Sequence, residues 1–139
     1  MNQTMRQDAY YIIGGTLKAV LPDEAVRRVL ENRTFPGRVV LAAAGKAAWQ
    51  MARAAQECLG DQLNRGVAVT KYGHGKGFIP RVACYEGGHP VPDECSFRGT
   101  EAVLALVEGL TEEDTVLFLL SGGGSALFEK PRTSPEVLQ

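Results

Sequence analysis

The segment from Val116 to Ser125, VLFLLSGGGS, constrains the fold of this chain more than any other stretch. Five consecutive apolar residues, Val116 to Leu120, predict a strand that is buried on both faces, as in a parallel sheet. The strand leads directly into Ser121, three glycines and Ser125. Glycine permits the positive φ angles that turn successive main-chain amides into one concavity, and it lets a ligand approach the backbone closely. The pattern predicts a binding site for phosphate or carboxylate, with a flexible turn as the plainer alternative.

The same order, a short apolar run followed by a polar loop, occurs three more times. Strands are predicted at 38–43, 66–70 and 81–85, and the residues that follow them are Gly45-Lys46, 71–77 and 86–93. In a parallel sheet ligands bind beyond the carboxyl ends of the strands, so these three stretches and 121–125 are expected to converge.

Apolar residues at helical spacing separate and precede these strands. They predict a helix over 6–20, a second that begins at Pro22 and a third from Lys46 to Leu59. A fourth is predicted to reach Leu110, with Ser96 as its N-cap. Helices that alternate with apolar strands favour an α/β protein. We therefore expect a three-layer α/β/α, Rossmann-like domain with a mostly parallel sheet.

Composition narrows the class of protein. The 139 residues suit one domain, and 45% apolar residues suffice for a core. A net charge of −1 predicts no bulk attraction to nucleic acid or to an anionic membrane. Residues 1–85 hold twelve basic and six acidic residues, whereas residues 86–139 hold three and ten. Cations that bind an anion are therefore expected mainly from the first part of the chain.

Cysteine usage and hydropathy bear on the compartment. Cys58, Cys84 and Cys95 are odd in number and lack metal-ligand spacing, so they are interpreted as reduced and mostly buried. No early apolar run has the length of a signal peptide or a membrane span. The expectation is a soluble, cytoplasmic protein without a membrane partner.

Lys46 is the main catalytic candidate. It is expected in the first turn of its helix, where the partial positive charge of the helix terminus disfavours a cation unless an anion sits above it. A lysine that only points to water is the alternative interpretation. The surroundings do not form a Walker A motif, because Val40 and Ala47 occupy two of its required positions.

Two further loops carry candidate ligands. Lys71 and His74 lie in KYGHGKG, whose spacing fails the dinucleotide fingerprint because Phe78 replaces the third glycine. This loop is either a mobile polar loop or a basic flap over an anion. His89 and Asp93 lie in a loop that two prolines stiffen, and they could face a ligand, although a loop histidine is more often a surface residue.

Four blocks together resemble the N-terminal part of the type-II glycerate kinases, the glycerate 2-kinase family whose members end in a MOFRL domain. The blocks are AAGKAA at 43–48, VTKYGHG at 69–75, EGGHPVPDE at 86–94 and LSGGGSAL at 120–127. Family members are about three times as long. The resemblance implies that residues 1–139 are an incomplete N-terminal α/β domain without the C-terminal domain. Ser134, Pro135 and Glu136, which resemble a helix start, agree with a piece of a longer protein.

The resemblance also implies an activity. Glycerate 2-kinases transfer the γ-phosphate of ATP to D-glycerate, usually giving 2-phosphoglycerate and ADP, with a divalent metal such as Mg²⁺. Lys46 matches the active-site lysine of the family. The residues that match its substrate- and phosphate-binding blocks are Lys71, His74, His89, Asp93, Ser121, Gly122, Gly123, Gly124 and Ser125.

Several points stay open at the level of the sequence. A general base and metal ligands are not assigned, and the fragment alone is expected to be inactive because further catalytic groups belong to the missing half. A homodimer is possible. The alternatives to the kinase are an oxidoreductase of the hydroxypyruvate reductase type and a non-catalytic phosphate-binding module. Against the reductase stands the missing dinucleotide fingerprint.

Overall fold

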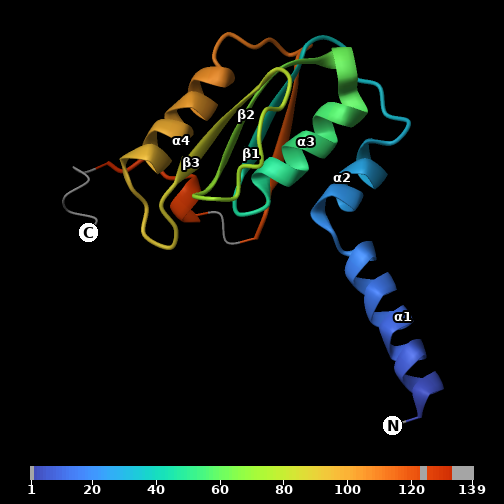
Figure 1. The fold of residues 1–139 in the computed structure, drawn as a ribbon. Coiled ribbons are helices and arrows are strands. Elements are labelled where there is room, and N and C mark those ends of the chain that lie inside the picture. Colours follow the sequence, from blue (N-terminus) through green and yellow to red (C-terminus); the bar gives the residue numbers. More distant parts are fainter. Residues whose placement is uncertain (1, 123–124, 133–139) are drawn as a thin grey trace.

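A computed structural model describes residues 2–122 and 125–132 as a parallel sheet covered by helices (Figure 1). The four strands stand in the order β3-β2-β1-β4. Their bounds are β1 Val39–Ala44, β2 Leu63–Lys71, β3 Val82–Gly87 and β4 Thr115–Leu120. Each neighbouring pair is parallel. The predicted mostly parallel α/β sheet is confirmed.

Helices cover both faces of the sheet (Figure 1). One face carries α3, and α2 packs on α3. The other face carries α4 and the short 3-10 helix η2. The remaining helices are α1, which precedes α2, and the 3-10 turn η1, which follows α3. The bounds are α1 Gln3–Ala19, α2 Pro22–Leu30, α3 Ala48–Leu59, η1 Gly60–Gln62, α4 Glu94–Leu106 and η2 Ser125–Leu127. The three-layer architecture follows from this arrangement.

The core forms around β1, whose six residues are all buried. β1 lies between β2 and β4, and its two faces pack against α3 and against α4 with η2. A strand covered on both faces requires a continuous run of apolar residues. α3 packs closely because its inward face is rich in alanine, including Ala48, Ala52 and Ala55. On the other face a Cβ at Gly99 would lie 2.8 Å from Val69 Cγ1, so this glycine lets α4 approach β2.

β4 is less buried than its sequence predicts. Val116, Phe118 and Leu120 are 45%, 44% and 59% exposed, so the expectation of burial on both faces is wrong for the described residues. The physical reason is position, since β4 is the last strand of the described sheet and α4 lies over β2 and β3. Phe118 has one aromatic neighbour, Phe128, with ring centroids 5.4 Å apart.

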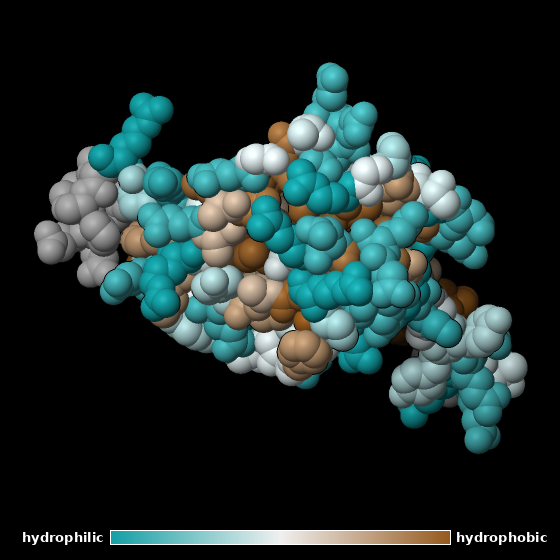
Figure 2. All heavy atoms as spheres, turned by 90° about the horizontal axis from the view of Figure 1, so that it is seen from above, coloured by the Kyte–Doolittle hydropathy of each residue, from teal (hydrophilic) through white to brown (hydrophobic). Residues whose placement is uncertain are grey.

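α1 also departs from the prediction of an inward-facing helix. It has no buried residue, and Ile12, Ile13 and Leu17 are more than half exposed. Asn2 caps the helix through a hydrogen bond that its side chain accepts from the Thr4 amide. Figure 1 shows α1 extending away from the sheet, and seen from above it projects from a surface that is mostly hydrophilic (Figure 2). The amphipathic pattern alone therefore did not predict whether this helix is buried.

Two smaller expectations also change, and a third is not tested. Cys58 and Cys84 are exposed and Cys95 is intermediate, so the cysteines are free thiols as expected but not mostly buried. The helix predicted to reach Leu110 ends at Leu106. The helix start predicted at 134–136 lies outside the described residues.

Among the residues described, no helix is both long and apolar enough to cross a membrane.

Candidate functional site at the carboxyl edge of the sheet

The predicted convergence of polar loops is confirmed by the strand register. β1 ends at Ala44 opposite Val69 and Leu120, and β2 ends at Lys71 opposite Gly87. The segments that follow all four strands therefore leave the sheet at one edge, on the lower side of the sheet in Figure 1. This edge is where α/β proteins of this architecture bind ligands.

Lys46 lies in a tight turn between β1 and α3. Gly45 has φ +112°, and its amide donates to Val69 O over 3.1 Å. The helix begins only at Ala48, with Ala47 as its N-cap, so Lys46 precedes the first turn in which it was expected. Its carbonyl accepts hydrogen bonds from Thr70 Oγ1 at 3.2 Å and from His74 Nδ1 at 3.0 Å. The main chain is thus fixed while the lysine itself is exposed.

Ser121 joins the end of β4 to the start of α3. Its hydroxyl accepts a hydrogen bond from the Ala47 amide over 3.1 Å, and its own amide donates to Ala44 O over 3.0 Å. Ser121, which follows β4, thus provides an acceptor for the amide of the residue that precedes α3. The predicted ligand hydroxyl therefore has protein partners.

Only part of the glycine-rich turn is described. Gly122 is exposed, and a Cβ on it would meet open space. Gly123 and Gly124 lie outside the described residues, and for Ser125 only the backbone at the start of η2 is described. Ser121 and Gly122 thus form the described part of the predicted anion site, and the role of the turn remains a prediction.

The loop after β2, residues 72–78, is tied to its neighbours. Trp49 Nε1 donates to Gly77 O over 2.9 Å, and the Gly75 amide donates to Glu86 Oε1 over 2.7 Å. His74 adds its bond to the Lys46 carbonyl. These contacts join the loop to α3, to β3 and to the turn after β1. The interpretation as a loosely held polar loop loses support, because three separate residues of the loop are anchored.

Lys71 ends β2 and is partly exposed, and its carbonyl accepts a hydrogen bond from the His74 amide over 3.0 Å. Lys46, Lys71 and Lys76 form no ion pair with any residue in the described ranges. All three come from the first 85 residues, as the charge distribution predicts. Three cations without a carboxylate partner leave this edge suited to an anion.

Asp93 has a different position from the one expected. It is the N-cap of α4: its Oδ1 accepts from the Ser96 amide at 2.9 Å, and Ser96 completes a capping box. Its Oδ2 accepts from Tyr72 Oη at 2.7 Å. The sequence favoured Ser96 as the N-cap, and the structure corrects this. Asp93 has the extended backbone of an N-cap, and Ser96 occupies the third helical position. Both oxygens of Asp93 have protein partners.

The hydrogen bonds also set the protonation of Asp93. Burial raises the pKa of this carboxyl, but the amides of Ser96 and Gly88 and the Tyr72 hydroxyl outweigh it and lower the pKa to about 2. His89 lies in the same loop and is partly exposed, and its ring forms no hydrogen bond within the ranges described. Its role as a ligand group remains a prediction.

Four residues of this edge were not singled out by the sequence. They are Thr70, Trp49, Tyr72 and Glu86, each of which holds a loop through a side-chain hydrogen bond. Trp49 is the single tryptophan of the chain and is 5% exposed. A buried indole needs an acceptor for its N–H, which is a signal that could have pointed to a nearby loop. The other three carry no comparable signal.

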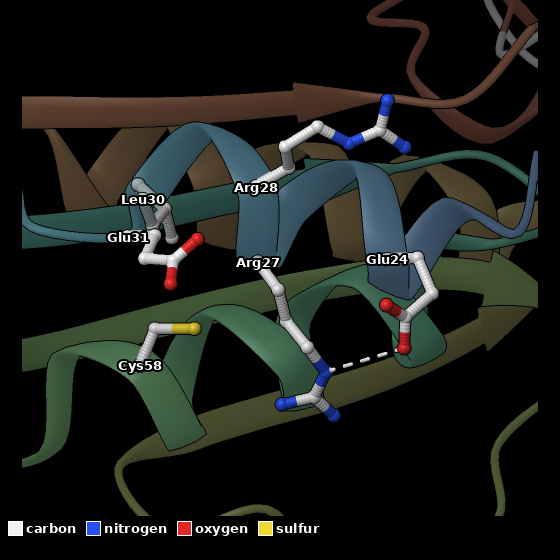
Figure 3. Close-up of a pocket in the computed structure, with 6 residues that line it drawn as sticks. All are labelled: Glu24, Arg27, Arg28, Leu30, Glu31 and Cys58. Carbon is white, nitrogen blue, oxygen red and sulfur yellow. Dashed lines mark ion pairs between the residues drawn. The ribbon is translucent and has the colours of Figure 1, made fainter. Parts of the chain in front are cut away.

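Two further recesses lie apart from Lys46. A recess of about 520 Å³ separates α2 from the C-terminal part of α3, and Figure 3 shows Arg27, Glu31 and Cys58 in it. Arg27 is paired there with Glu24 at 4.0 Å and with Glu57 at 2.7 Å, so its charge is matched. An apolar groove of about 390 Å³ runs between α2 and β4 as far as Gly122. The first recess contains none of the sequence candidates, and the apolar groove reaches only Ser121 and Gly122 among them.

Metal ligands are a separate question. Within residues 2–122 and 125–132, no three His, Cys, Asp or Glu side chains gather in a way that could hold a metal ion. Asp93 is the one carboxylate among the sequence candidates, and both of its oxygens accept hydrogen bonds from protein groups. The described residues therefore do not fit a metal centre held by the protein.

The fold and this edge define a class of protein: a Rossmann-like α/β domain with a cationic, glycine-containing cluster at the carboxyl ends of its strands. Within that class the chain belongs to the family described as "Domain of unknown function (DUF4147)", whose sequence profile matches residues 8–137. The match covers nearly the whole chain, including all four polar segments that follow the strands.

Relatives of this chain carry two kinds of name. It is 52% identical to the D-glycerate 2-kinase of Thermotoga maritima over 93% of this chain and 31% of the relative. It is 43% identical to a putative hydroxypyruvate reductase of Agrobacterium vitis over 91% of this chain and 28% of the relative. The crystal structure of glycerate kinase from Thermotoga maritima matches with a TM-score of 0.90 and 49% identity, over 97% of this chain and 33% of that chain.

These matches confirm the resemblance to glycerate kinases that four sequence blocks indicated. They also confirm the α/β fold. The chain spans about a third of the length of the relatives it matches.

Proposed function

We propose that this chain is the N-terminal α/β domain of an ATP-dependent glycerate 2-kinase, which converts D-glycerate and ATP to 2-phosphoglycerate and ADP. The observation that carries the proposal is that hydrogen bonds hold the loop 72–78 and Ser121 to the turn 45–47, which carries Lys46, at one sheet edge: His74 bonds to Lys46 O and Ser121 to the Ala47 amide. The same residues occur in the sequence blocks that resemble glycerate kinases, and a relative at 52% identity bears the name D-glycerate 2-kinase.

The chemistry of phosphoryl transfer suits such a cluster. In this reaction the protein supplies mostly position and electrostatic stabilisation, because charge spreads over the oxygens of the transferred group. Lys46 would contact those oxygens with its ammonium group, which its fixed main chain holds near the edge. The glycine-rich turn 121–125 would donate main-chain amides to phosphate or to the carboxylate of glycerate. His89, Asp93 and Lys71 are proposed to line the substrate side.

A divalent cation, in particular Mg²⁺, would neutralise the phosphates of ATP, as it does in kinases generally. The described carboxylates do not fit a protein-held centre, so none of the roles proposed here for Lys46 or Ser121 depends on one. The relatives are about three times as long as this chain, and we propose that the residues of a protein of that length outside 1–139 complete the site. The 139 residues alone are accordingly expected to lack kinase activity.

A reductase acting on hydroxypyruvate is the second candidate, because one relative at 43% identity carries that name. The loop 72–78 does not favour it, since Phe78 replaces the glycine that closes a dinucleotide fingerprint. A phosphate-binding module without catalysis is the third candidate. Glycerate-dependent consumption of ATP distinguishes the kinase from the reductase, which would oxidise NADH with hydroxypyruvate. Phosphate-ester binding without either reaction would favour the module.

The test of Lys46 uses the full-length protein. Lys46→Ala is expected to lower kcat for phosphoryl transfer to glycerate by about 100-fold or more, the scale of losing one charge-stabilising group. Circular dichroism and the melting temperature should stay at the wild-type values, because Lys46 is exposed and unpaired within the described residues. Lys18→Ala, on the exposed helix α1, is the control for removing one lysine. Wild-type turnover by Lys46→Ala would exclude the role assigned to this residue.

A further inference from the structure

A recess of about 310 Å³ opens between the start of α3 and the loop 72–78. Its lining residues are Lys46, Trp49, Gln50, Gly73, His74 and Lys76. We call it the cationic recess. It adjoins Lys46 and lies over the first turn of α3, so a ligand in it would contact the turn after β1 and the loop after β2 together.

The charges in the cationic recess have one sign. Lys46 and Lys76 are cations, His74 can become one, and no carboxylate is among the lining residues. Both lysines are exposed, and neither forms an ion pair with a described residue. Unmatched cations around a concave surface concentrate a positive potential there, which attracts anions.

A second recess of about 300 Å³ extends the first along α3. The two share Trp49, Gln50 and Lys76, and the second adds Arg27 and Arg53, which both pair with Glu57. Its one acidic residue, Asp23, accepts a hydrogen bond from Gln50 Nε2 over 2.9 Å. The two recesses adjoin along α3, and together they hold more space than one carboxylate would fill. A chain of linked phosphates is the larger anion that suits this space beside Lys46 and Lys76.

The loop wall of the cationic recess is already in place without a ligand. Trp49 Nε1 holds Gly77 O at 2.9 Å, and His74 Nδ1 holds Lys46 O at 3.0 Å. Trp49 is buried under the loop. Ordering a loop on binding reduces affinity, so a wall that is anchored beforehand favours the bound state.

His74 can bind an anion without giving up this anchor. A carbonyl oxygen can only accept, so Nδ1 carries the proton in its bond to Lys46 O. The opposite nitrogen, Nε2, remains for a ligand, and the protonated ring donates from both nitrogens at once. Nε2 is therefore the ring nitrogen at which His74 can contact a phosphate oxygen while Nδ1 keeps its bond to Lys46 O.

We infer that the cationic recess binds the phosphate chain of the nucleotide substrate, with Lys76 and His74 as direct contacts beside Lys46. This inference rests on the proposed kinase function for its assignment to a nucleotide. With the phosphate chain in the cationic recess, the turn 121–125 would bind the smaller anion, the carboxylate of glycerate. Lys76 then has a specific role within the loop that the sequence interpreted as a basic flap over an anion.

The first experiment measures both substrate constants in the full-length enzyme. Lys76→Gln keeps the length and polarity of the side chain and removes its charge. It is expected to raise KM for ATP about tenfold, the scale of one lost charge-assisted hydrogen bond, and to change KM for glycerate by less than about twofold. Lys76→Arg should restore most of the ATP affinity. Lys18→Gln is the matched control. An increase confined to KM for glycerate would refute the assignment.

The second experiment needs no turnover and separates the two proposals. Calorimetry with inorganic tripolyphosphate is expected to show binding by the wild type and about tenfold weaker binding by Lys76→Gln and by His74→Ala. If tripolyphosphate binds in this way but glycerate is not phosphorylated, the proposed function fails and the recess remains a polyphosphate site. If glycerate is phosphorylated but Lys76→Gln alters neither ATP KM nor tripolyphosphate binding, the inference about the recess is wrong.

Discussion

At the scale of single residues, Gly45 shows how one backbone position shapes the site. Its φ of +112° is accessible to glycine and strained for other residues. A Cβ there would collide with the Ser121 hydroxyl and lie 2.8 Å from Ser121 O. The turn that presents Lys46 and the serine that fixes Ala47 therefore depend on the missing side chain.

Gly45→Ala is expected to lower the free energy of unfolding by about 1–3 kcal/mol from backbone strain, with the collision adding to it. Denaturation by urea, followed by circular dichroism, measures the change. Gly14→Ala is the matched control, because a Cβ at Gly14 meets open space in a helix and should stabilise by up to about 1 kcal/mol. Equal stability of the two variants would mean that the turn adopts another conformation in solution.

Asp93 provides a prediction about pH. Its pKa falls from 3.8 unfolded to about 2 folded, so its contribution to stability is present above pH 4 and is lost as the pH falls toward 2. Asp93→Ala should lower stability by about 1 kcal/mol at neutral pH, the usual effect of losing an N-cap, and by less near pH 2. Melting temperatures from pH 7 to pH 2 test this. Asp8→Ala, at an exposed side chain of α1 without an ion pair among the described residues, should leave the wild-type pH profile unchanged.

At the scale of elements, the two N-terminal helices differ although both sequences are amphipathic. α2 buries Val26 and Leu30 against α3, whereas α1 buries no residue. A helical repeat records which side chains could share a face, but it does not say whether another element covers that face. Burial therefore has to come from the tertiary arrangement.

A pair of identical substitutions tests this difference. Leu30→Ala should cost about 2–5 kcal/mol of unfolding free energy, because Leu30 is 5% exposed in the core. Leu17→Ala, at 60% exposure on α1, should cost less than about 0.5 kcal/mol. Urea midpoints of the two variants make the comparison. A large loss with Leu17→Ala would show that α1 packs on another surface in solution.

The sequence predicted the elements better than their surroundings. The apolar runs of β1, β2 and β4 and the polar loops behind them follow from local composition, and parallel pairing then brings the loops together. The exposure of Phe118 could not be predicted in this way, because it depends on which strand ends the sheet. The N-cap of α4 was also ambiguous, since Asp93 and Ser96 are both suitable N-cap residues. The backbone conformation decides which of them precedes the first helical residue.

The side-chain anchors of the site were hidden for a similar reason. Lys46 and the glycine-rich turn were identified from residue types that suit anions. Trp49 and Thr70 act through hydrogen bonds to main-chain carbonyls in other segments. Main-chain carbonyls are the same in every residue, so no sequence pattern marks these partners.

At the scale of the whole molecule, the charge is nearly balanced but unevenly distributed. The chain carries −1 overall, and its unpaired lysines at the carboxyl edge all come from the basic first part. Long-range attraction of an anion by the net charge is therefore absent. Binding at this edge is therefore expected to depend on the local field of Lys46, Lys71 and Lys76, which acts over short distances and is screened by salt.

This balance predicts how salt affects binding. Between ionic strengths of 0.01 M and 0.15 M the screening length falls from about 30 Å to about 8 Å. The affinity of the full-length protein for tripolyphosphate is expected to fall about tenfold across this range. Lys76→Gln should reduce the slope of log Kd against log salt, because one cation fewer contributes, whereas Lys18→Gln should keep the wild-type slope. Calorimetric titrations at four salt concentrations give these slopes, and a salt-independent Kd would contradict a site built from exposed lysines.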